Sequence, residues 1–297
     1  MKEFILNKIV LKILFRIITL IIFIVTKLQT FCAFVGLAFN LISIGKTQRI
    51  FVVSFPKSGT TWLEMVMYQL TTDGDLNKIS HLMDAVPFLE TQLNPINLLP
   101  AKIIKTHLPH KWFWMLRKKG KFLYITRDGL DVAVSYYHHY CNYLDYTGSF
   151  NEFYESHFLN LKAQDGSWFR HISGWMKEKD NPNVLFLRYE DMKKDLESII
   201  RKIIKFCELD VKEKDMPRIL ERCSFEYMKQ HEDKVDFASH FNAQLSHTKK
   251  KVGNFIRKGG SGYRDGYRES DLIAYQKLFS KYLGSMGFDL YSKADEI

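Results

Sequence analysis

The chain has 297 residues, of which 46% are hydrophobic and 26% charged, so it can form a full-sized core and is not a disordered chain. Its 16 glycines and 7 prolines follow no repeat, which excludes collagen-like and repeat architectures, and its 4 cysteines include no CxxC pair, which argues against a disulfide scaffold or a zinc knuckle. Of the net charge of +10, residues 1–49 carry +6, because they hold seven Lys or Arg against one Glu. The folded part that follows is therefore only weakly basic, and we predict no nucleic-acid partner.

The first 48 residues combine positive charge with long apolar runs. Residues 17–26 and 28–45 contain no charged side chain, and the second run would span about 27 Å as a helix. On a helical projection Lys8, Lys12, Arg16 and Lys27 share one arc, which is typical of an interfacial amphipathic helix. We therefore predict that residues 1–48 attach the protein to a membrane surface, as an anchor or an interfacial helix. The alternatives are a cleaved signal peptide and a soluble helix packed on the core.

Two patterns disagree about the side of the membrane on which the folded domain lies. No Asn-x-Ser/Thr sequon occurs in the chain, which favours a cytosolic domain. The lysines and arginines that precede the apolar runs favour the opposite orientation. We expect a membrane-associated protein with a cytosolic domain, and a soluble cytoplasmic protein is the alternative.

Beyond residue 48 short apolar runs alternate with amphipathic segments. Strands are predicted at residues 49–55, 102–105, 122–126 and 184–187. Helices are predicted to begin near residue 60, to cover residues 131–140, and to run near 191–207 and 270–283, with a loop-rich lobe at 229–253. Alternating strands and helices indicate an α/β fold with a mainly parallel sheet flanked by helices. Because no linker interrupts this pattern, residues 49–297 are predicted to form a single domain.

A basic residue stands at or just after the end of each predicted strand: Lys57, Lys105, Arg127 and Arg188. In an open parallel sheet, ligands bind outside the carboxyl ends of the strands. Cations gathered at that edge indicate a site for a strongly anionic ligand.

Residues 55–62 follow the pattern of a P-loop-like phosphate-binding strand–loop–helix. The backbone N–H groups of such a turn and the positive end of the helix suit phosphate oxygens, while Lys57 adds a charge and Thr60 and Thr61 add hydroxyls. Residues 45–47 end like a Walker A sequence, but residue 40 is Asn40 where that motif needs its first glycine, and the segment precedes the strand. For Lys57 alone, the alternative is a solvated lysine in a turn.

The segment PKSGTTW at residues 56–62 resembles the 5′-phosphosulfate-binding loop of the cytosolic-type sulfotransferases, which use 3′-phosphoadenosine 5′-phosphosulfate (PAPS). Similar segments follow in the family's order: VPFLE at 86–90, KTHLP at 105–109, RDGLDVAVSYYHHY at 127–140, GSW at 166–168, YEDMKKD at 189–195, CSFEYMK at 223–229 and RKGGSG at 257–262. The resemblance covers about residues 49–262 and leaves the N-terminal 48 residues outside. It implies an enzyme that transfers the sulfuryl group of PAPS to a hydroxyl, and we expect the acceptor to be a small, apolar alcohol or phenol.

The resemblance also implies roles for individual residues. His107, in KTHLP, matches the family's general base, and an imidazole can accept the proton of an attacking hydroxyl near neutral pH. Lys57 and Lys105 would stabilise negative charge on the reacting groups, and Ser135 completes the implied catalytic set. The residues implied in cofactor binding are Lys57, Ser58, Gly59, Thr60, Thr61, Trp62, Arg127, Ser135, Tyr189, Cys223, Phe225, Arg257, Lys258 and Gly259. Phe88, Lys105 and His107 are implied in acceptor binding.

Some positions depart from the family pattern. Asp265 stands where a lysine is common, which would weaken the closure of this lobe over the cofactor, and Cys223 stands where Ser or Thr is usual, so a weaker hydrogen-bond donor replaces a hydroxyl. No match to the family's short C-terminal dimerisation segment is found, which leaves a dimer open. No metal is predicted, because lysines and arginines neutralise the charge and the adjacent His138 and His139 diverge by about 100° on a helix.

Two other functions fit parts of the pattern. An ATP-dependent kinase would use the same loop, but it needs a strand-end carboxylate for Mg²⁺, and the strand ends carry Lys105 and Arg127 instead. A membrane-tethered nucleotide-binding protein without turnover is suggested by Asp265, whereas the presence of Lys57 and His107 argues against it.

Overall fold

The computed structural model describes residues 48–91, 101–160, 166–236, 255–257, 259–260, 264 and 266–286. Apart from Gln48, the predicted membrane-attachment segment of residues 1–48 lies outside these ranges, so its attachment stays a prediction. Among the helices within these ranges, none combines the length and the apolar character of a membrane span.

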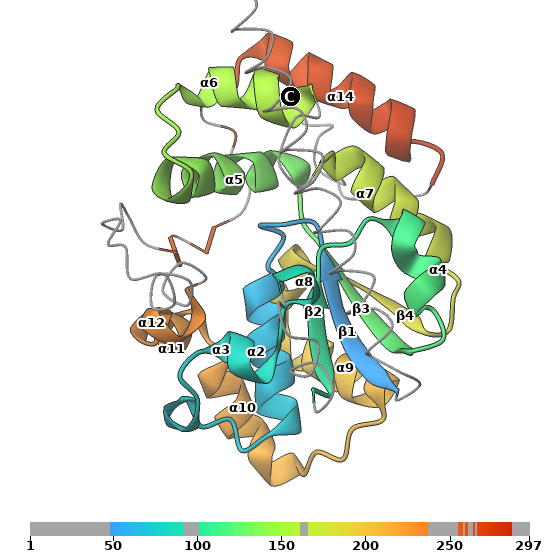
Figure 1. Ribbon diagram of the computed structural model, residues 1–297, viewed down its shortest axis with the longest axis vertical. Helices are drawn as coiled ribbons and strands as arrows, with labels where there is room; N and C mark the ends of the chain where they lie inside the picture. Colours follow the sequence, from blue (N-terminus) through green and yellow to red (C-terminus); the bar gives the residue numbers. More distant parts are fainter. Residues whose placement is uncertain are drawn as a thin grey trace, which may run out of the picture.

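The centre of the fold is a parallel sheet with the strand order β2-β1-β3-β4 (Figure 1). The strands are β1 (Arg49–Ser54), β2 (Ile103–Thr106), β3 (Gly120–Thr126) and β4 (Val184–Arg188). Their register places Val52 of β1 between Lys105 and Leu123 of the neighbouring strands. β1 is buried from Phe51 to Ser54, as expected for a strand covered on both faces. The predicted strands and the parallel sheet are confirmed, each strand within two residues of its expected bounds.

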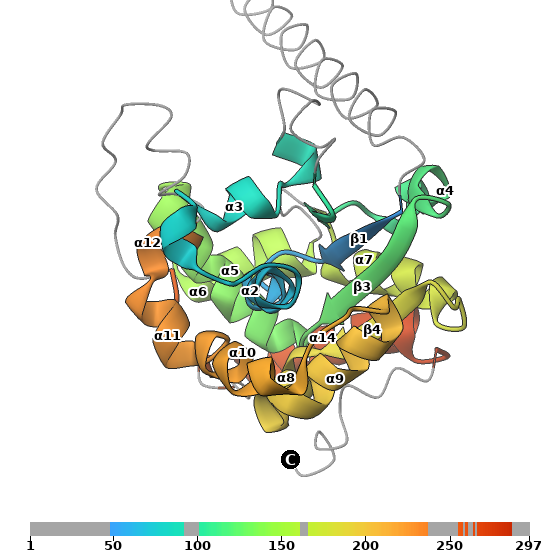
Figure 2. The ribbon, with the colours of Figure 1, turned by 90° about the horizontal axis from the view of Figure 1, so that it is seen from below.

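Helices cover both faces of the sheet and its carboxyl edge (Figures 1 and 2). They are α2 (Thr60–Thr71), α3 (Leu82–Ala85), α4 (Phe113–Leu116), α5 (Gly129–Tyr143), α6 (Phe150–Phe153), α7 (Trp168–Trp175), α8 (Tyr189–Lys194), α9 (Leu196–Cys207), α10 (Met216–Arg222), α11 (Phe225–Gln230), α12 (Glu232–Val235) and α14 (Glu269–Leu283). The helices expected from residue 60, over 131–140 and near 270–283 are confirmed as α2, α5 and α14.

Two predicted elements were wrong. The helix expected near 191–207 is two helices, because Asp195 leaves the helical conformation (φ −152°, ψ 83°) and its carboxylate accepts the Ser198 N–H, which caps α9. The predicted loop-rich lobe starts with helices instead, since α11 and α12 continue to Val235. Ser224 caps α11 through the Tyr227 N–H, and Met228 and Val235 are buried, so these polar helices are held by a few apolar contacts. Residues 237–254 of that lobe lie outside the described ranges.

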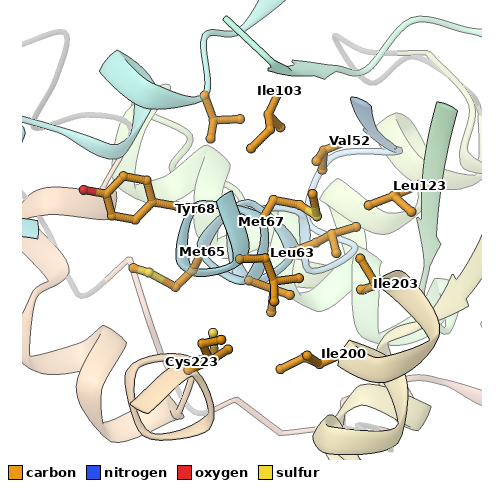
Figure 3. Packing of buried hydrophobic residues seen from close by; sticks show 14 of the residues in the cluster. Val52, Leu63, Met65, Met67, Tyr68, Ile103, Leu123, Ile200, Ile203 and Cys223 are labelled. Atoms are coloured by element: carbon orange, nitrogen blue, oxygen red, sulfur yellow. The ribbon is translucent and has the colours of Figure 1, made fainter. Parts of the chain in front are cut away.

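One face of the sheet packs on α2, α9 and α10 through aliphatic side chains (Figure 3). Leu63 and Met67 of α2, Val52 and Leu123 of the sheet, and Ile203 of α9 are all fully buried in this core. The apolar face of α2 is thus fixed against β1 and β3, which positions the loop that joins β1 to α2.

The opposite face of the sheet and its carboxyl edge are covered by aromatic side chains. On the opposite face Phe122 stacks on Phe51 with 4.8 Å between ring centroids and meets Phe113 of α4 edge-on at 5.0 Å. At the carboxyl edge, a second aromatic cluster joins α5, α6, α7 and α14, with Tyr136 and Trp168 among its buried members. This second cluster holds α5 across the end of the sheet, beside the crevice described next.

The strand order reverses next to β1, since β2 lies on one side of it and β3 and β4 on the other. Such a reversal leaves a crevice at the carboxyl ends of the strands. The loop of residues 55–59 leaves β1 at this point and enters α2 as a tight turn. Lys57 and Gly59 have left-handed φ angles of 68° and 97°, and the Ser58 N–H donates to the Phe55 carbonyl at 3.3 Å. The free N–H groups of the first turn of α2 therefore lie at the crevice.

The Gly59→Ala variant is expected to lose more stability than the matched Gly166→Ala variant. Both glycines have left-handed φ angles, 97° and 82°, which cost a residue with a Cβ about 1 kcal/mol. A Cβ on Gly59 would lie 2.6 Å from Cδ2 of Tyr189, whereas a Cβ on Gly166 would meet no atom within 4 Å. Urea unfolding of both variants measures the difference, which we expect to be about 1–3 kcal/mol. Equal losses would mean that Tyr189 moves freely and does not pack on the loop.

Candidate active site

Three cations from different strand ends gather at the crevice. Lys57 follows β1, Lys105 lies in β2 and Arg127 follows β3. Burial is the largest cause that lowers the pKa of Lys57 to about 8, and the charges of Lys105 and Arg127 lower it further, against an opposing effect of Asp236. The ring of Phe255 lies near the Lys57 ammonium, with 4.7 Å between Nζ and the ring centroid. The structure thus brings together three of the four cations that the sequence places at strand ends.

The remaining strand-end cation and Lys105 each lie near a carboxylate. Arg188 ends the outer strand β4, where its side chain is 38% exposed and its Nε lies 4.0 Å from Oε2 of Glu190. Nζ of Lys105 lies 2.9 Å from Oε1 of Glu64 on α2, and both side chains are more than nine-tenths buried. Glu64 therefore neutralises part of the charge of the crevice, a role that the sequence analysis missed because Lys105 is far from Glu64 along the chain.

The guanidinium of Arg127 joins the loop after β1 to the segment near residue 260. Its Nη2 donates to the Gly260 carbonyl at 2.7 Å, its Nη1 donates to the Lys57 carbonyl at 3.4 Å, and it lies 4.4 Å from the ring centroid of Tyr189. The Nε of Arg127 and the hydroxyl of Ser58 are buried and have no hydrogen-bond partner among the described residues. Buried donors of this kind fit an anionic ligand with several oxygen acceptors.

Aromatic side chains line the same region. The rings of Trp62 and Tyr189 meet edge-on with 5.5 Å between centroids, and the Tyr189 hydroxyl donates to the Gly259 carbonyl at 3.3 Å. Gly259 has a φ of 56°, and a Cβ there would lie 2.7 Å from Phe225, so this ring lies directly against the glycine. The structure therefore places Tyr189 and Phe225 against Gly259, and Trp62 against Tyr189.

Cys223 lies differently from what a ligand contact would require. Its side chain is fully buried in the aliphatic core under α2 (Figure 3), and burial raises the pKa of its thiol to about 12. Its carbonyl accepts the indole N–H of Trp62 at 2.7 Å. In the described structure Cys223 therefore contacts the candidate site through its backbone, which fixes the orientation of Trp62.

His107, directly after β2, is held in one tautomer. Its Nδ1 lies 2.8 Å from the Ser54 carbonyl, which can only accept a hydrogen bond, so Nδ1 carries the proton and Nε2 keeps its lone pair. The pKa of His107 lies well below its ordinary value of 6.5, first because the ring is desolvated and second because Lys105 repels a second positive charge. A neutral imidazole with a free Nε2 is the form that can accept a proton.

The backbone around His107 is fixed by a carboxyl group that the sequence analysis did not single out. Oε1 of Glu90 accepts the His107 N–H at 2.6 Å and the Thr106 hydroxyl at 2.9 Å. Burial raises the pKa of Glu90 to about 7, although these two hydrogen bonds oppose the shift. Behind the ring, Nε2 of His171 lies 3.1 Å from the His107 carbonyl. Glu90 and His171 thus position His107 from two sides. In the sequence, only the place of Glu90 inside the segment VPFLE could have indicated a role for this carboxyl group.

The wall next to His107 is aromatic. The ring of Phe88 meets the imidazole edge-on with 5.1 Å between centroids, and Nζ of Lys105 lies 5.1 Å from the same Phe88 ring. The ring of His139 on α5 is tilted against the ring of Tyr143 with 4.9 Å between centroids. Burial is the largest cause that lowers the pKa of His139 to about 3, and the charges of Lys57 and Lys105 lower it further. Phe88 therefore places an apolar ring beside His107. His139 is a second neutral imidazole near the two lysines, and the sequence analysis did not predict it as a site residue.

The other predicted residues occupy the surrounding elements. Thr60 and Thr61 open α2, and the Thr60 hydroxyl lies 2.6 Å from the Ser54 hydroxyl. Ser135 lies in the second turn of α5, and Arg257 stands between Phe255 and Gly259. Lys258 and Asp265 lie outside the described residues, so the effect of Asp265 on this lobe stays a prediction. Beside it, Nη2 of Arg264 donates to Oδ2 of Asp128 at 2.6 Å, which ties this lobe to the start of α5.

Comparison with known proteins identifies the class. The sulfotransferase domain family matches residues 47–285 of this chain. Rat sulfotransferase 1C2 is 31% identical over 256 residues, which are 80% of this chain and 84% of that protein. Mouse sulfotransferase 1E1 is 33% identical over 232 residues, which are 73% of this chain and 76% of that protein. The chain therefore belongs to the sulfotransferase family and is an enzyme of that class, as the motifs predicted.

A solved relative shares the fold. The crystal structure of mouse sulfotransferase SULT7A1 complexed with PAP aligns with a TM-score of 0.65 at 28% identity, over 83% of this chain and 90% of that one. The α/β fold with a parallel sheet and a P-loop-like strand–loop–helix is thus the fold of that family as well.

The Glu90→Gln variant is expected to gain stability relative to the wild type as the pH rises. The pKa of Glu90 in the folded protein, about 7, lies above its ordinary value of 4.5, so ionisation of this carboxyl opposes folding. The wild type therefore loses the corresponding stability as the pH rises from 4.5 through 7, whereas glutamine does not titrate. Thermal melting at pH 5 and pH 8 measures the effect as a change in the Tm difference between the two proteins.

The control is Glu226→Gln, which removes an exposed carboxyl of α11. Its Tm difference from the wild type should be the same at both pH values. If Glu90→Gln behaves like this control, the Glu90 carboxyl ionises in the folded protein as it does in the unfolded chain, and its positioning of His107 does not depend on burial.

Proposed function

We propose that this chain transfers the sulfuryl group of PAPS to the hydroxyl of a small, apolar alcohol or phenol, with His107 as the general base. The observation that carries the proposal is the neutral His107 ring, with its Nδ1–H on the Ser54 carbonyl, near the half-buried Lys57 and the buried Lys105. A base and several cations at one sheet edge suit a transfer between two oxygens in which charge builds up on a leaving phosphate. The PAP in the related mouse structure supports a nucleotide of this kind.

In the proposed reaction, the acceptor oxygen forms a bond to sulfur while the bond between sulfur and the bridging phosphate oxygen breaks. Nε2 of His107 takes the acceptor's proton. The electron pair of the broken bond stays on the leaving phosphate, where Lys57 stabilises it, and Lys105 stabilises the sulfuryl oxygens. Because this charge is larger in the transition state than in the ground state, fixed cations lower the barrier.

The other predicted residues would hold the nucleotide. The backbone of the 55–59 loop and the hydroxyls of the first turn of α2 suit the 5′-phosphosulfate: Ser58, Gly59, Thr60 and Thr61. For the 3′-phosphate we propose Arg127, Ser135 and the segment Arg257, Lys258 and Gly259, since the Nε of Arg127 is a buried donor without a partner among the described residues. Trp62, Tyr189 and Phe225 would enclose the adenine, with Cys223 acting through its carbonyl on Trp62.

The acceptor side is proposed from the wall of the space beside His107. Phe88 is 9% exposed and presents its ring next to the imidazole and the Lys105 ammonium. An aromatic wall favours a flat or aliphatic body that carries the reacting hydroxyl. A small apolar alcohol or phenol meets this description.

The organisation of the chain and its location are part of the proposal. We propose that residues 1–48 form a segment apart from the sulfotransferase domain of residues 49–297, and the start of the family match at residue 47 supports this division. The uncharged runs and the net charge of residues 1–49 support attachment of that segment to a membrane surface with the domain in the cytosol.

The His107→Ala variant is expected to lose sulfuryl transfer by about 100-fold or more while it keeps its affinity for the nucleotide. The base is removed, but the loop, the cations and the aromatic rings are not. Transfer of labelled sulfate from PAPS to a panel of phenols and apolar alcohols measures activity. Thermal unfolding with adenosine 3′,5′-bisphosphate measures binding, with a stabilisation of about 2.7 kcal/mol when the ligand is at ~100 times its Kd.

The matched control is His110→Ala. His110 directly follows the segment KTHLP that contains His107, but its Nε2 lies 2.7 Å from Oε1 of Glu178. This variant should keep its activity. Near-full turnover by His107→Ala would show that another group takes the proton. Stabilisation of the wild type by Mg-ADP and none by the bisphosphate would overturn the nucleotide assignment.

Binding of the bisphosphate is expected to weaken as the pH rises above about 8. The pKa of Lys57 is about 8, so the ammonium is charged below this value and loses its proton above it. An anionic ligand favours the charged form, so binding at pH 9 should take up a proton. Calorimetric titrations in two buffers of different ionisation enthalpy measure both the affinity and this uptake.

The Lys57→Met variant should bind weakly and show no such proton uptake, whereas the exposed control Lys212→Met should behave like the wild type. A wild-type affinity that stays constant from pH 7 to 9.5 would contradict the proposal that the Lys57 ammonium binds the nucleotide.

A further inference from the structure

Helix α4 covers the face of the sheet opposite to α2, and it exposes a tryptophan to solvent. Trp114 is 66% exposed, and the other strongly exposed large apolar side chains in the described ranges, Leu144 and Ile273, reach 44% and 49%. Its neighbours Phe113 and Leu116 are buried against the sheet. The helix is thus anchored by one side, and the indole of Trp114 lies on its exposed side.

Cations surround this tryptophan. Lys111 and Arg117 line, together with Trp114, a surface hollow of about 330 Å³. Between residues 110 and 127 the sequence contains no Asp or Glu. The carboxylate in the hollow, Glu178, has hydrogen-bond partners in His110 at 2.7 Å and Asn181 at 2.9 Å. The side chains around Trp114 that remain exposed are therefore mainly basic.

The same basic surface continues to the amino-terminal ends of the strands. The Arg49 N–H donates to the Lys119 carbonyl at 2.9 Å, and the Ile50 N–H donates to the Lys102 carbonyl at 2.9 Å, so the backbones of Lys102 and Lys119 flank the start of β1. Burial and, after it, the charge of Arg49 lower the pKa of Lys119. The exposed side chain of Lys102 and the half-buried side chain of Lys119 add positive charge at this edge.

The first 47 residues of the chain join the domain at this edge. β1 begins at Arg49 beside the turn that follows α4 (Figure 2). The sequence before it holds the uncharged runs 17–26 and 28–45 and most of the excess positive charge. The exposed tryptophan, the exposed lysines and the entry of the apolar segment therefore occur together on one side of the domain.

We propose that this side of the domain lies on an anionic lipid bilayer, through an α4 surface made of Lys102, Lys111, Trp114, Arg117, Lys118 and Lys119. A tryptophan ring prefers the headgroup level of a bilayer, and lysines and arginines next to it attract anionic headgroups. An acidic protein partner would use the cations but would not account for an apolar N-terminal segment that enters at the same edge. The surface belongs to the folded domain, so it adds a contact beyond that of residues 1–48.

The experiment uses the fact that residues 1–47 contain no tryptophan, so quenching of tryptophan fluorescence reports on the folded domain alone. The full chain is mixed with vesicles of phosphatidylcholine and phosphatidylserine that carry a quencher at the headgroup end of the acyl chains. We expect quenching for the wild type and its loss for Trp114→Phe. The matched control Trp112→Phe removes a half-buried tryptophan of the same segment and should keep the quenching.

Charge is tested in the same assay. Arg117→Gln with Lys118→Gln removes two exposed cations of the α4 surface and should weaken binding to anionic vesicles about 30-fold. Lys212→Gln with Lys214→Gln removes two exposed lysines beside α10 and should leave binding unchanged.

Three outcomes would overturn the proposal. Sedimentation of the chain with vesicles without any quenching would show that residues 1–47 alone attach it to the membrane. Quenching that persists in Trp114→Phe would place the contact on another surface. A change of association state in Trp114→Phe without lipid, measured by sedimentation velocity, would show that the α4 surface binds a second copy of the chain.

Discussion

The repulsion among Lys57, Lys105 and Arg127 is the constraint on which the rest of the site depends. Moving a charged group out of water costs several kcal/mol unless it is paired, and here three cations share one edge of the sheet. Lys105 has a close carboxylate partner, Glu64, and Nη2 of Arg127 lies 3.9 Å from Oδ2 of Asp131, whereas Lys57 has the ring of Phe255 and a charge effect of Asp236 on its pKa. Among the described residues Lys57 has no carboxylate at ion-pair distance, so its positive charge is not fully neutralised. A ligand with several negative charges would complete the site, with no need for the protein to rearrange when it binds.

Ser54, the last residue of β1, connects the proposed base His107 to the proposed nucleotide-binding loop. Its carbonyl fixes the tautomer of His107, and its hydroxyl lies 2.6 Å from that of Thr60 at the start of α2. Because β1 is the strand at which the order reverses, this residue lies between the two halves of the sheet. A shift of β1 relative to β2 would therefore change the base and the loop together. The aliphatic core under α2 and the aromatic core under α4 prevent such a shift from both faces.

The sequence predicted what depends on local pattern and missed what depends on contacts between distant segments. The strands, the glycine turn and α2 follow from apolar runs and turn residues, and His107 follows from the resemblance of its own segment to a family motif. Glu64 and Glu90 could not be assigned roles from the sequence. Glu64 lies inside α2, whose sequence pattern is mainly apolar, and Glu90 lies 17 residues before His107, whose backbone N–H it accepts. The break between α8 and α9 was missed because the capping role of Asp195 depends on its own dihedral angles.

The low pKa of His107 also limits how an acceptor can be activated. A base whose pKa is well below 6.5 is always neutral near pH 7, but it is a weak proton acceptor. Lys105 contributes to that weakness, since its charge disfavours imidazolium, and yet the same charge stabilises the oxygen anion that forms when the acceptor loses its proton. The loss in basicity is therefore offset by a gain in the acidity of the acceptor. In the proposed mechanism, proton transfer to Nε2 would become favourable only as the oxygen–sulfur bond forms, which would tie the action of His107 to the transition state instead of to the free enzyme.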